Sequence, residues 1–202
     1  YAWSMGWLLY HLAAQPTLDI LSWLIVVLLG FEIFYITIQA GRGMASHFNL
    51  SSPAYAALYN LMAAAATGVS LLTLYAAILF FRGDFPSLEP SYLWGIRLGM
   101  ILFVVFSLEG FVMGSRLNHT IGGLDGGRGL PFLNWSLLHG DPRVPHFVGM
   151  HALQILPLFG WALGKQLKYL FVVAVIYALL AVYTLVLALN GRPLPFLNDS
   201  GH

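Results

Sequence analysis

Residues 92–114, YLWGIRLGMILFVVFSLEGFVMG, decide the fold class because they form a predominantly apolar run long enough to cross a membrane. A spanning helix needs roughly 20 such residues. Comparable runs occur elsewhere in the chain, at residues 18–40, 54–81, 147–163 and 169–189. In lipid only helices and closed barrels satisfy their own backbone hydrogen bonds. We therefore predict an all-α fold, a polytopic transmembrane helical bundle with five full spans.

The composition agrees with this class and excludes others. The chain has 202 residues, of which 59% are hydrophobic and 8% are charged, so too few charges exist to solvate the surface of a soluble protein. A net charge of +1 argues against nucleic acid as a partner, because its binding needs a clustered basic face. The absence of cysteine excludes disulfides, thiolate zinc sites and iron–sulfur clusters. The expected partner is the lipid bilayer.

Residues 1–14 are also apolar, but they are too few for a complete span. We expect either an N-terminal partial span, with further sequence upstream, or an interfacial helix. Since there are no repeats and no low-complexity tracts, residues 1–202 are interpreted as a single transmembrane domain. Its longest connection, at about 115–146, is polar and glycine-rich, and its apolar segment LPFLNW suggests that it caps the mouth of the bundle.

Alternation of the spans sorts the connections onto two membrane faces. Face one receives residues 41–53, 115–146 and 190–202, and face two receives the connections at residues 15–17, 82–91 and 164–168. Every histidine except His11 falls on or near face one, together with five arginines: Arg42, Arg116, Arg128, Arg143 and Arg192. The positive-inside rule then predicts that face one is the cytoplasmic side, in a bacterial cytoplasmic membrane.

Two carboxylates lie within predicted spans. Glu32 begins a polar stripe with Tyr35, Gln39 and Arg42 at helical spacing, and Glu109 shares a helix side with Arg116 seven residues later. A charge that faces lipid is costly, so both glutamates should face the bundle interior. They either form buried structural pairs with their own helix neighbours or handle protons, and spacing alone does not separate these alternatives.

Four histidines are candidate ligands of a metal ion or haem iron. His47, His119, His146 and His151 come from different helix ends near face one, where three or four imidazoles could converge. His146 and His151 are five residues apart and cannot bind one ion from one helix face. The alternative for any single histidine is a solvated role at the membrane interface.

The glycine-rich loop could bind an anion. Glycines surround Asp125 and Arg128 and permit backbone conformations that could form a nest for a propionate, phosphate or carboxylate. The alternative is a flexible connection. Candidate cofactor-binding residues share a polar or charged side chain near face one: Arg42, Arg116, Asn118, Arg128, Asp141, Arg143 and Gln154.

Three function classes are compatible with this pattern. The first is a redox or electron-transfer protein with haem b or a histidine-bound metal at face one, and with Glu32 or Glu109 handling protons. The second is a small-solute binding or transport protein. The third is a structural or accessory subunit with other membrane subunits as partners. Whether the chain is an enzyme stays open.

Overall fold

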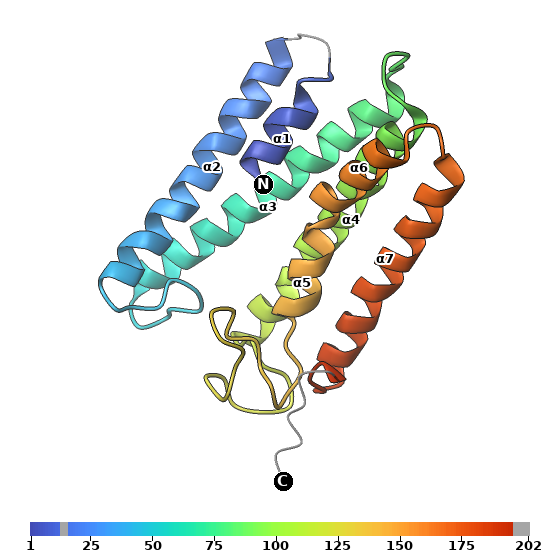
Figure 1. Cartoon of the computed structure of the whole chain (residues 1–202). Helices are drawn as coiled ribbons and strands as arrows, with labels where there is room; N and C mark the ends of the chain where they lie inside the picture. Colours follow the sequence, from blue (N-terminus) through green and yellow to red (C-terminus); the bar gives the residue numbers. More distant parts are fainter. Residues whose placement is uncertain (13–15, 196–202) are drawn as a thin grey trace.

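The computed structural model describes residues 1–12 and 16–195 and confirms the all-α transmembrane bundle. Within the described residues the only pairing of β type consists of isolated bridges. Among the described residues, five segments are long and apolar enough to cross a membrane, and one of them, Arg143–Leu163, consists of two consecutive helices. The helices, shown in Figure 1, are α1 (Ala2–Leu9), α2 (Pro16–Gly41), α3 (Pro53–Arg82), α4 (Pro90–Arg116), α5 (Arg143–Met150), α6 (Ala152–Leu163) and α7 (Leu167–Leu189).

Local sequence explains the helix ends. Both α3 and α4 begin with a proline, which lacks the N–H that a first helical residue cannot use and has a φ angle suited to the helix. Ser52 caps α3 by accepting a hydrogen bond from the Tyr55 backbone N–H at 3.3 Å. Leu117 ends α4 in a left-handed conformation at φ 50°. As a result the observed helices lie within a few residues of the predicted spans.

The fourth span differs from its prediction. It begins at Arg143, four residues before the predicted Phe147, and it is interrupted at His151. At the interruption His151 Nδ1 lies 2.7 Å from the Phe147 carbonyl oxygen, and Tyr177 Oη donates to the Val148 carbonyl at 2.5 Å. Side chains thus engage carbonyl groups at the end of α5.

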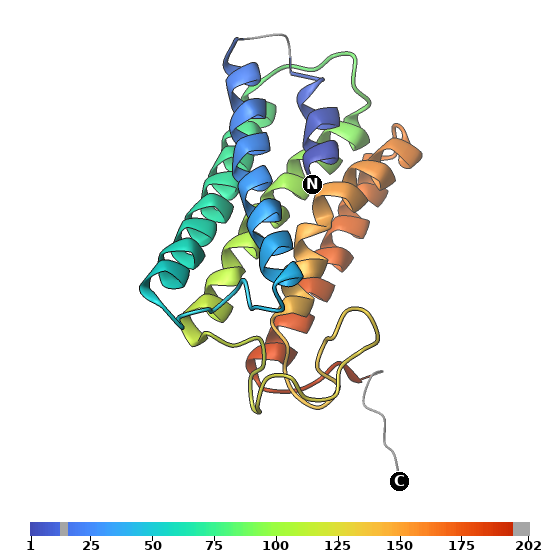
Figure 2. The same ribbon diagram turned by 90° about the vertical axis from the view of Figure 1, so that its left-hand side faces the viewer.

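The short helix α1 packs against the longer helices of the bundle, and the choice between a partial span and an interfacial helix stays a prediction. Figures 1 and 2 show it beside α2, in the half of the bundle that lies toward face two. Its Met5, Leu8 and Leu9 are buried in a core that also receives side chains from α2, α3, α4 and α6. The opposite side exposes Trp3 and Trp7. Burial of one apolar side therefore fixes α1 against the longer helices.

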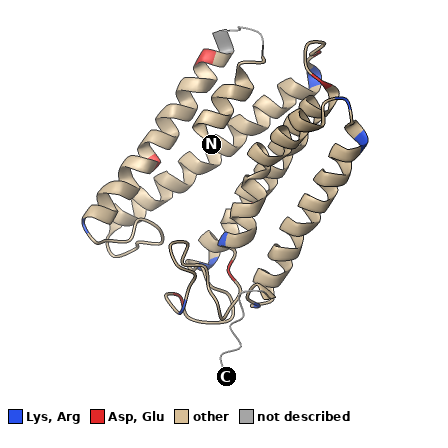
Figure 3. Ribbon diagram, in the orientation of Figure 1, with Lys and Arg blue, Asp and Glu red and all other residues tan. Residues whose placement is uncertain are grey.

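Helix α4 lies at the centre of the bundle, against α3, α5, α6 and α7. The outer helices α2 and α7 leave large apolar side chains exposed, including Trp23, Val27, Ile176 and Leu179. Such a surface is unfavourable in water and suits lipid. Lysine, arginine, aspartate and glutamate gather mostly at the two ends of the bundle, as Figure 3 shows. The bilayer environment follows from this distribution.

The connections at residues 42–52 and 117–142 lie at the same end of the bundle, face one, as predicted (Figure 1). The longer loop is held to itself by two isolated antiparallel bridges, Ile121 with Gly140 and Gly129 with Ser136. It also packs against the end of α7, where a Cβ on Gly140 would lie 2.1 Å from the Ala188 carbonyl oxygen. The loop therefore packs against the C-terminal end of α7.

Candidate functional site

The most unusual site in the bundle joins a buried carboxyl group to an imidazole on another helix. Glu109 of α4 is 9% exposed, and its Oε2 lies 3.6 Å from Nδ1 of His146 in α5. Within the described part of the chain, neither carboxyl oxygen of Glu109 nor His146 Nδ1 has a hydrogen-bond partner. Gly110 leaves room for the imidazole, because a Cβ there would lie 3.1 Å from His146 Cε1.

A third titratable group comes from α2. Glu32 is half-buried and lies close enough to His146 for their charges to interact. One turn further, Tyr35 is 6% exposed and its hydroxyl has no partner among the described residues. We call Glu32, Glu109 and His146 the carboxylate–imidazole site. It brings together three helices that are distant in sequence. Glu32 and Glu109 lie inside predicted spans, and His146 lies one residue before the predicted start of the fourth span.

Of the residues predicted to pair with the two glutamates, Gln39 and Arg42 form hydrogen bonds with other groups. Gln39 donates to the Ala45 carbonyl at 3.2 Å, and Arg42 donates to Tyr55 Oη at 2.9 Å. Arg116 is exposed at the end of α4, and none of the described ion pairs joins it to Glu109. The prediction that Glu109 faces the interior is confirmed, but the titratable side chain beside it is His146. Helical spacing relates residues on one helix only, and this contact is made between two helices.

His119 and His47 lie together at face one. His119 Nδ1 is 2.9 Å from Asp125 Oδ2, and the Phe48 ring packs 4.7 Å from the His119 ring. Burial would raise the pKa of Asp125, but hydrogen bonds from His119 and Thr120 outweigh it, so the pKa is lowered. Burial, and then the like charge of His119, lowers the pKa of His47. His47 is therefore a neutral imidazole at neutral pH.

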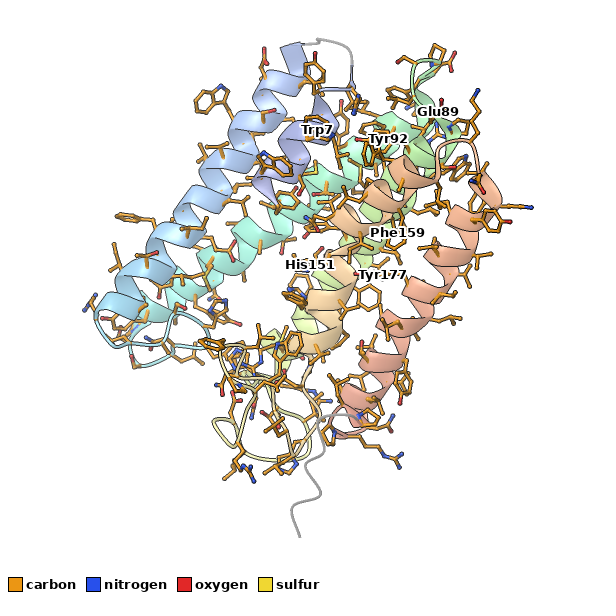
Figure 4. The ribbon with its side chains drawn as sticks, viewed as in Figure 1. Trp7, Glu89, Tyr92, His151, Phe159 and Tyr177 are labelled. Carbon is orange, nitrogen blue, oxygen red and sulfur yellow. The ribbon has the colours of Figure 1, made fainter. Side chains whose placement is uncertain are left out.

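The other predicted ligands lie in separate surroundings. His151 contacts Phe147, with ring centroids 3.9 Å apart, and in Figure 4 its ring lies on the side of α5 away from α7. Gln154 Nε2 donates to Ser4 Oγ of α1 at 3.1 Å. No three histidine, aspartate or glutamate side chains in residues 1–12 and 16–195 are grouped to hold one metal ion. Ligation of a metal ion or haem iron by His47, His119, His146 and His151 stays a prediction.

Asp141 and Arg143 orient each other at the entrance to α5. Asp141 is 4% exposed and accepts hydrogen bonds from Arg143 Nε at 2.9 Å and from Arg143 Nη2 at 2.6 Å. It also accepts from the Ser136 and Arg143 backbone N–H groups. This pair anchors the loop to the start of α5.

In the first part of the loop, polar side chains accept hydrogen bonds from backbone N–H groups of other residues in the loop. Asn118 Oδ1 accepts from the Thr120 backbone N–H at 2.7 Å, and Asp125 Oδ2 accepts from the His119 backbone N–H at 3.2 Å. Gly122 and Gly126 have positive φ angles, as the glycine-rich pattern predicts. Arg128 lies between these glycines and the second bridge at Gly129. The loop that was predicted to bind an anion thus uses Asn118 and Asp125 to fold itself.

Sequence reasoning missed Arg97, a charged residue within α4. Its Nε donates to the Phe80 carbonyl at 2.9 Å, and its guanidinium lies over the rings of Phe81 and Trp94. The available signal was plain, because an arginine interrupts the apolar run of residues 92–114. Arg97 adds a fourth basic residue toward face two. The excess of basic residues on face one is therefore smaller than a count of the loops alone indicates.

Comparisons with protein-family models, curated proteins and solved structures find no match for the chain. The function must therefore be argued from the geometry.

Proposed function

We propose that this chain is an integral membrane protein that takes up and releases protons at the carboxylate–imidazole site, in the service of small-solute transport. The observation that carries the proposal is that Glu109 Oε2 lies 3.6 Å from His146 Nδ1, while neither atom has a hydrogen-bond partner among the described residues. A buried carboxyl group without a partner is costly when ionised. Such groups within spans are typical of proton relays.

The three groups together can store a proton at moderate cost. Glu109 and His146 carry no net charge either as carboxylate with imidazolium or as two neutral groups, and each form holds one proton. The charges of Glu32 and His146 interact, and Glu32 can hold a second proton as a neutral carboxylic acid. Release of one proton leaves the site with one net negative charge. An imidazolium at His146 can then offset one of the two carboxylate charges in this medium of low dielectric constant.

The site lies in the half of the bundle that leads to face one. Along α2 the polar stripe Glu32, Tyr35, Gln39 and Arg42 continues from the site to that face. Toward face two, the apolar core formed by α1 and its neighbours fills the bundle. These features support proton exchange with face one.

We further propose that face one is cytoplasmic in a bacterial cytoplasmic membrane. Five arginines support this orientation, against Arg82, Arg97, Lys165 and Lys168 toward the opposite face. Labelling a cysteine at exposed Leu124 in intact cells tests it, since reaction with an impermeant reagent from outside would reverse the assignment.

Infrared difference spectroscopy of the purified protein during a pH titration tests the proton site. We expect a protonated carboxyl band that titrates in the wild-type protein and loses the Glu109 component in Glu109→Gln, because an amide cannot ionise. The matched control is Glu89→Gln, the same substitution at an exposed position that precedes α4. His146→Gln should keep the band and move its titration midpoint. A band that Glu109→Gln leaves unchanged would remove the basis of the proposal.

A haem b group or metal ion bound through His151 is a second candidate. Because a carbonyl oxygen only accepts, His151 Nδ1 must donate to Phe147, which leaves Nε2 as the free acceptor nitrogen. Metal-ligating histidines commonly have this arrangement. Such a group would supply redox chemistry when bound.

Visible absorption distinguishes the second candidate from the first. If His151 ligates haem, the purified protein should show a Soret band that His151→Ala abolishes or shifts and that His11→Ala, toward face two, leaves unchanged. A colourless protein of native fold, purified from haem-supplemented cells, would reject the haem version, and metal analysis of the same sample would decide the metal version.

A further inference from the structure

Arg97 lies in the membrane-spanning part of α4, near face two and away from the carboxylate–imidazole site. It follows Pro90 by seven residues, which places it about 10 Å along the helix from that end. Its Nε donates to the carbonyl of Phe80, two residues before the end of α3. An arginine at this depth can extend its guanidinium to the level of the lipid headgroups.

Among the described residues, no carboxylate is paired with the charge of Arg97. None of the described ion pairs includes Arg97, and its only described hydrogen bond uses Nε. The contact with the Phe80 carbonyl caps the end of α3, which accounts for one donor. The two terminal amino groups, with their remaining N–H donors, are not used by that cap.

Aromatic rings surround the guanidinium on the outer surface of the bundle. Its central carbon lies 5.5 Å from the Phe81 ring centroid and 5.2 Å from that of Trp94. The Trp94 ring in turn contacts Phe171 of α7 at 5.4 Å. Phe81 is 43% exposed and Phe171 is 37% exposed, on helices whose outer surface suits lipid. Phe81, Trp94 and Phe171 thus form an apolar surface beside the guanidinium, which we call the aromatic wall. It faces outward from the bundle.

Next to this wall is a cavity at face two with a volume of about 470 Å³. Trp94 and Leu93 of α4 line it together with Lys165 from the turn before α7, and Glu89 lies on the same lining. Figure 4 shows Glu89 near this end of the bundle. Lys165 therefore brings a second cation to the region where a headgroup would lie.

We propose that Arg97, with Lys165 and the aromatic wall, binds an anionic phospholipid. A guanidinium presents paired N–H donors that match phosphate oxygens, and it keeps its charge in apolar surroundings. The phosphate would take the terminal amino groups of Arg97, while an acyl chain would lie against Phe81 and Phe171. A lipid fits better than free phosphate because the wall faces the hydrocarbon region.

Native mass spectrometry of the purified protein tests the proposal. Wild-type protein is mixed with phosphatidylglycerol and phosphatidylcholine of identical acyl chains, and the lipid retained is counted. We expect about a fivefold preference for phosphatidylglycerol, the effect of one cation near an anionic headgroup. Arg97→Gln should lose the preference, and Arg97→Lys should keep part of it. Arg192→Gln, at exposed Arg192 near face one, is the matched control and should behave as wild type.

Each outcome decides the assignment. Equal retention of the two lipids by the wild-type protein would overturn it, even if Arg97→Gln fails to fold. A preference that survives in folded Arg97→Gln would also overturn it. Displacement of phosphatidylglycerol by millimolar inorganic phosphate would show that the phosphate alone is recognised and would overturn the lipid assignment. None of these results depends on proton exchange at Glu109, so this inference and the proposed function can fail separately.

Discussion

Asp141→Asn is expected to destabilise the loop at face one and the start of α5 by about 3 kcal/mol, the order of magnitude for breaking a buried ion pair. Asp141 Oδ1 accepts from the Arg143 backbone N–H at 3.0 Å and from Arg143 Nε at 2.9 Å. Asp141 Oδ2 accepts from the Ser136 backbone N–H at 2.8 Å and from Arg143 Nη2 at 2.6 Å. An asparagine of the same shape has one acceptor oxygen, so its amide N–H₂ would face two donors.

Thermal unfolding in detergent and limited proteolysis of residues 117–142 measure this effect. Asp125→Asn is the matched control because it is the same substitution in the same loop, at a pair with His119 that is more exposed. The side chain of Asp125 is 38% exposed, whereas that of Asp141 is 2% exposed. Solvent screening limits an exposed pair to roughly 0–1 kcal/mol. Equal losses in the two variants would show that the Asp141–Arg143 pair does not anchor the loop.

The spans could be predicted because their signals are local. An apolar run, a proline at its start and a glycine or polar break at its end lie within a short stretch of sequence, and α3 and α4 match their predictions for this reason. The interruption at His151 could not be predicted in the same way. It coincides with hydrogen bonds to carbonyl groups, one of them from Tyr177 of another helix.

The candidate site could be predicted only in part. The cost of a lipid-facing charge correctly placed Glu109 in the interior. Its neighbour His146 lies on another helix, and only tertiary packing brings the two within 3.6 Å. Arg116 was an attractive partner because it lies on the same helix, where spacing can be counted. Likewise, the rotation of each helix about its axis decides which histidine side chains come into contact. The spacing of residues along one helix carries no information about that rotation.

Gly99→Ala is expected to destabilise the bundle by about 1–3 kcal/mol, and Gly99→Leu to prevent native packing of α4 against α6. A Cβ on Gly99 would lie 2.6 Å from the Ala152 carbonyl oxygen, and one on Gly95 would lie 2.5 Å from that of Leu156. At the next position of this register, a Cβ on Gly160 would lie 2.3 Å from the Ser91 carbonyl oxygen. Steps of four residues on both helices place at least one small residue at each of these three contacts, as in other close helix pairs in membranes.

The backbone of α6 cannot yield to the added methyl group at Gly99 without shifting the whole helix, because the obstructing atoms belong to its main chain. Such a shift would also move α5 and with it His146, so Gly99→Ala should disturb the carboxylate–imidazole site as well as stability. Gly30→Ala in α2 is the matched control, since a Cβ there meets nothing within 4 Å. It should be neutral or stabilising by about 0.5–1 kcal/mol, the usual gain of alanine over glycine in a helix. Unfolding midpoints in detergent compare the two variants, and an equal or smaller loss for Gly99→Ala would contradict close packing of α4 on α6.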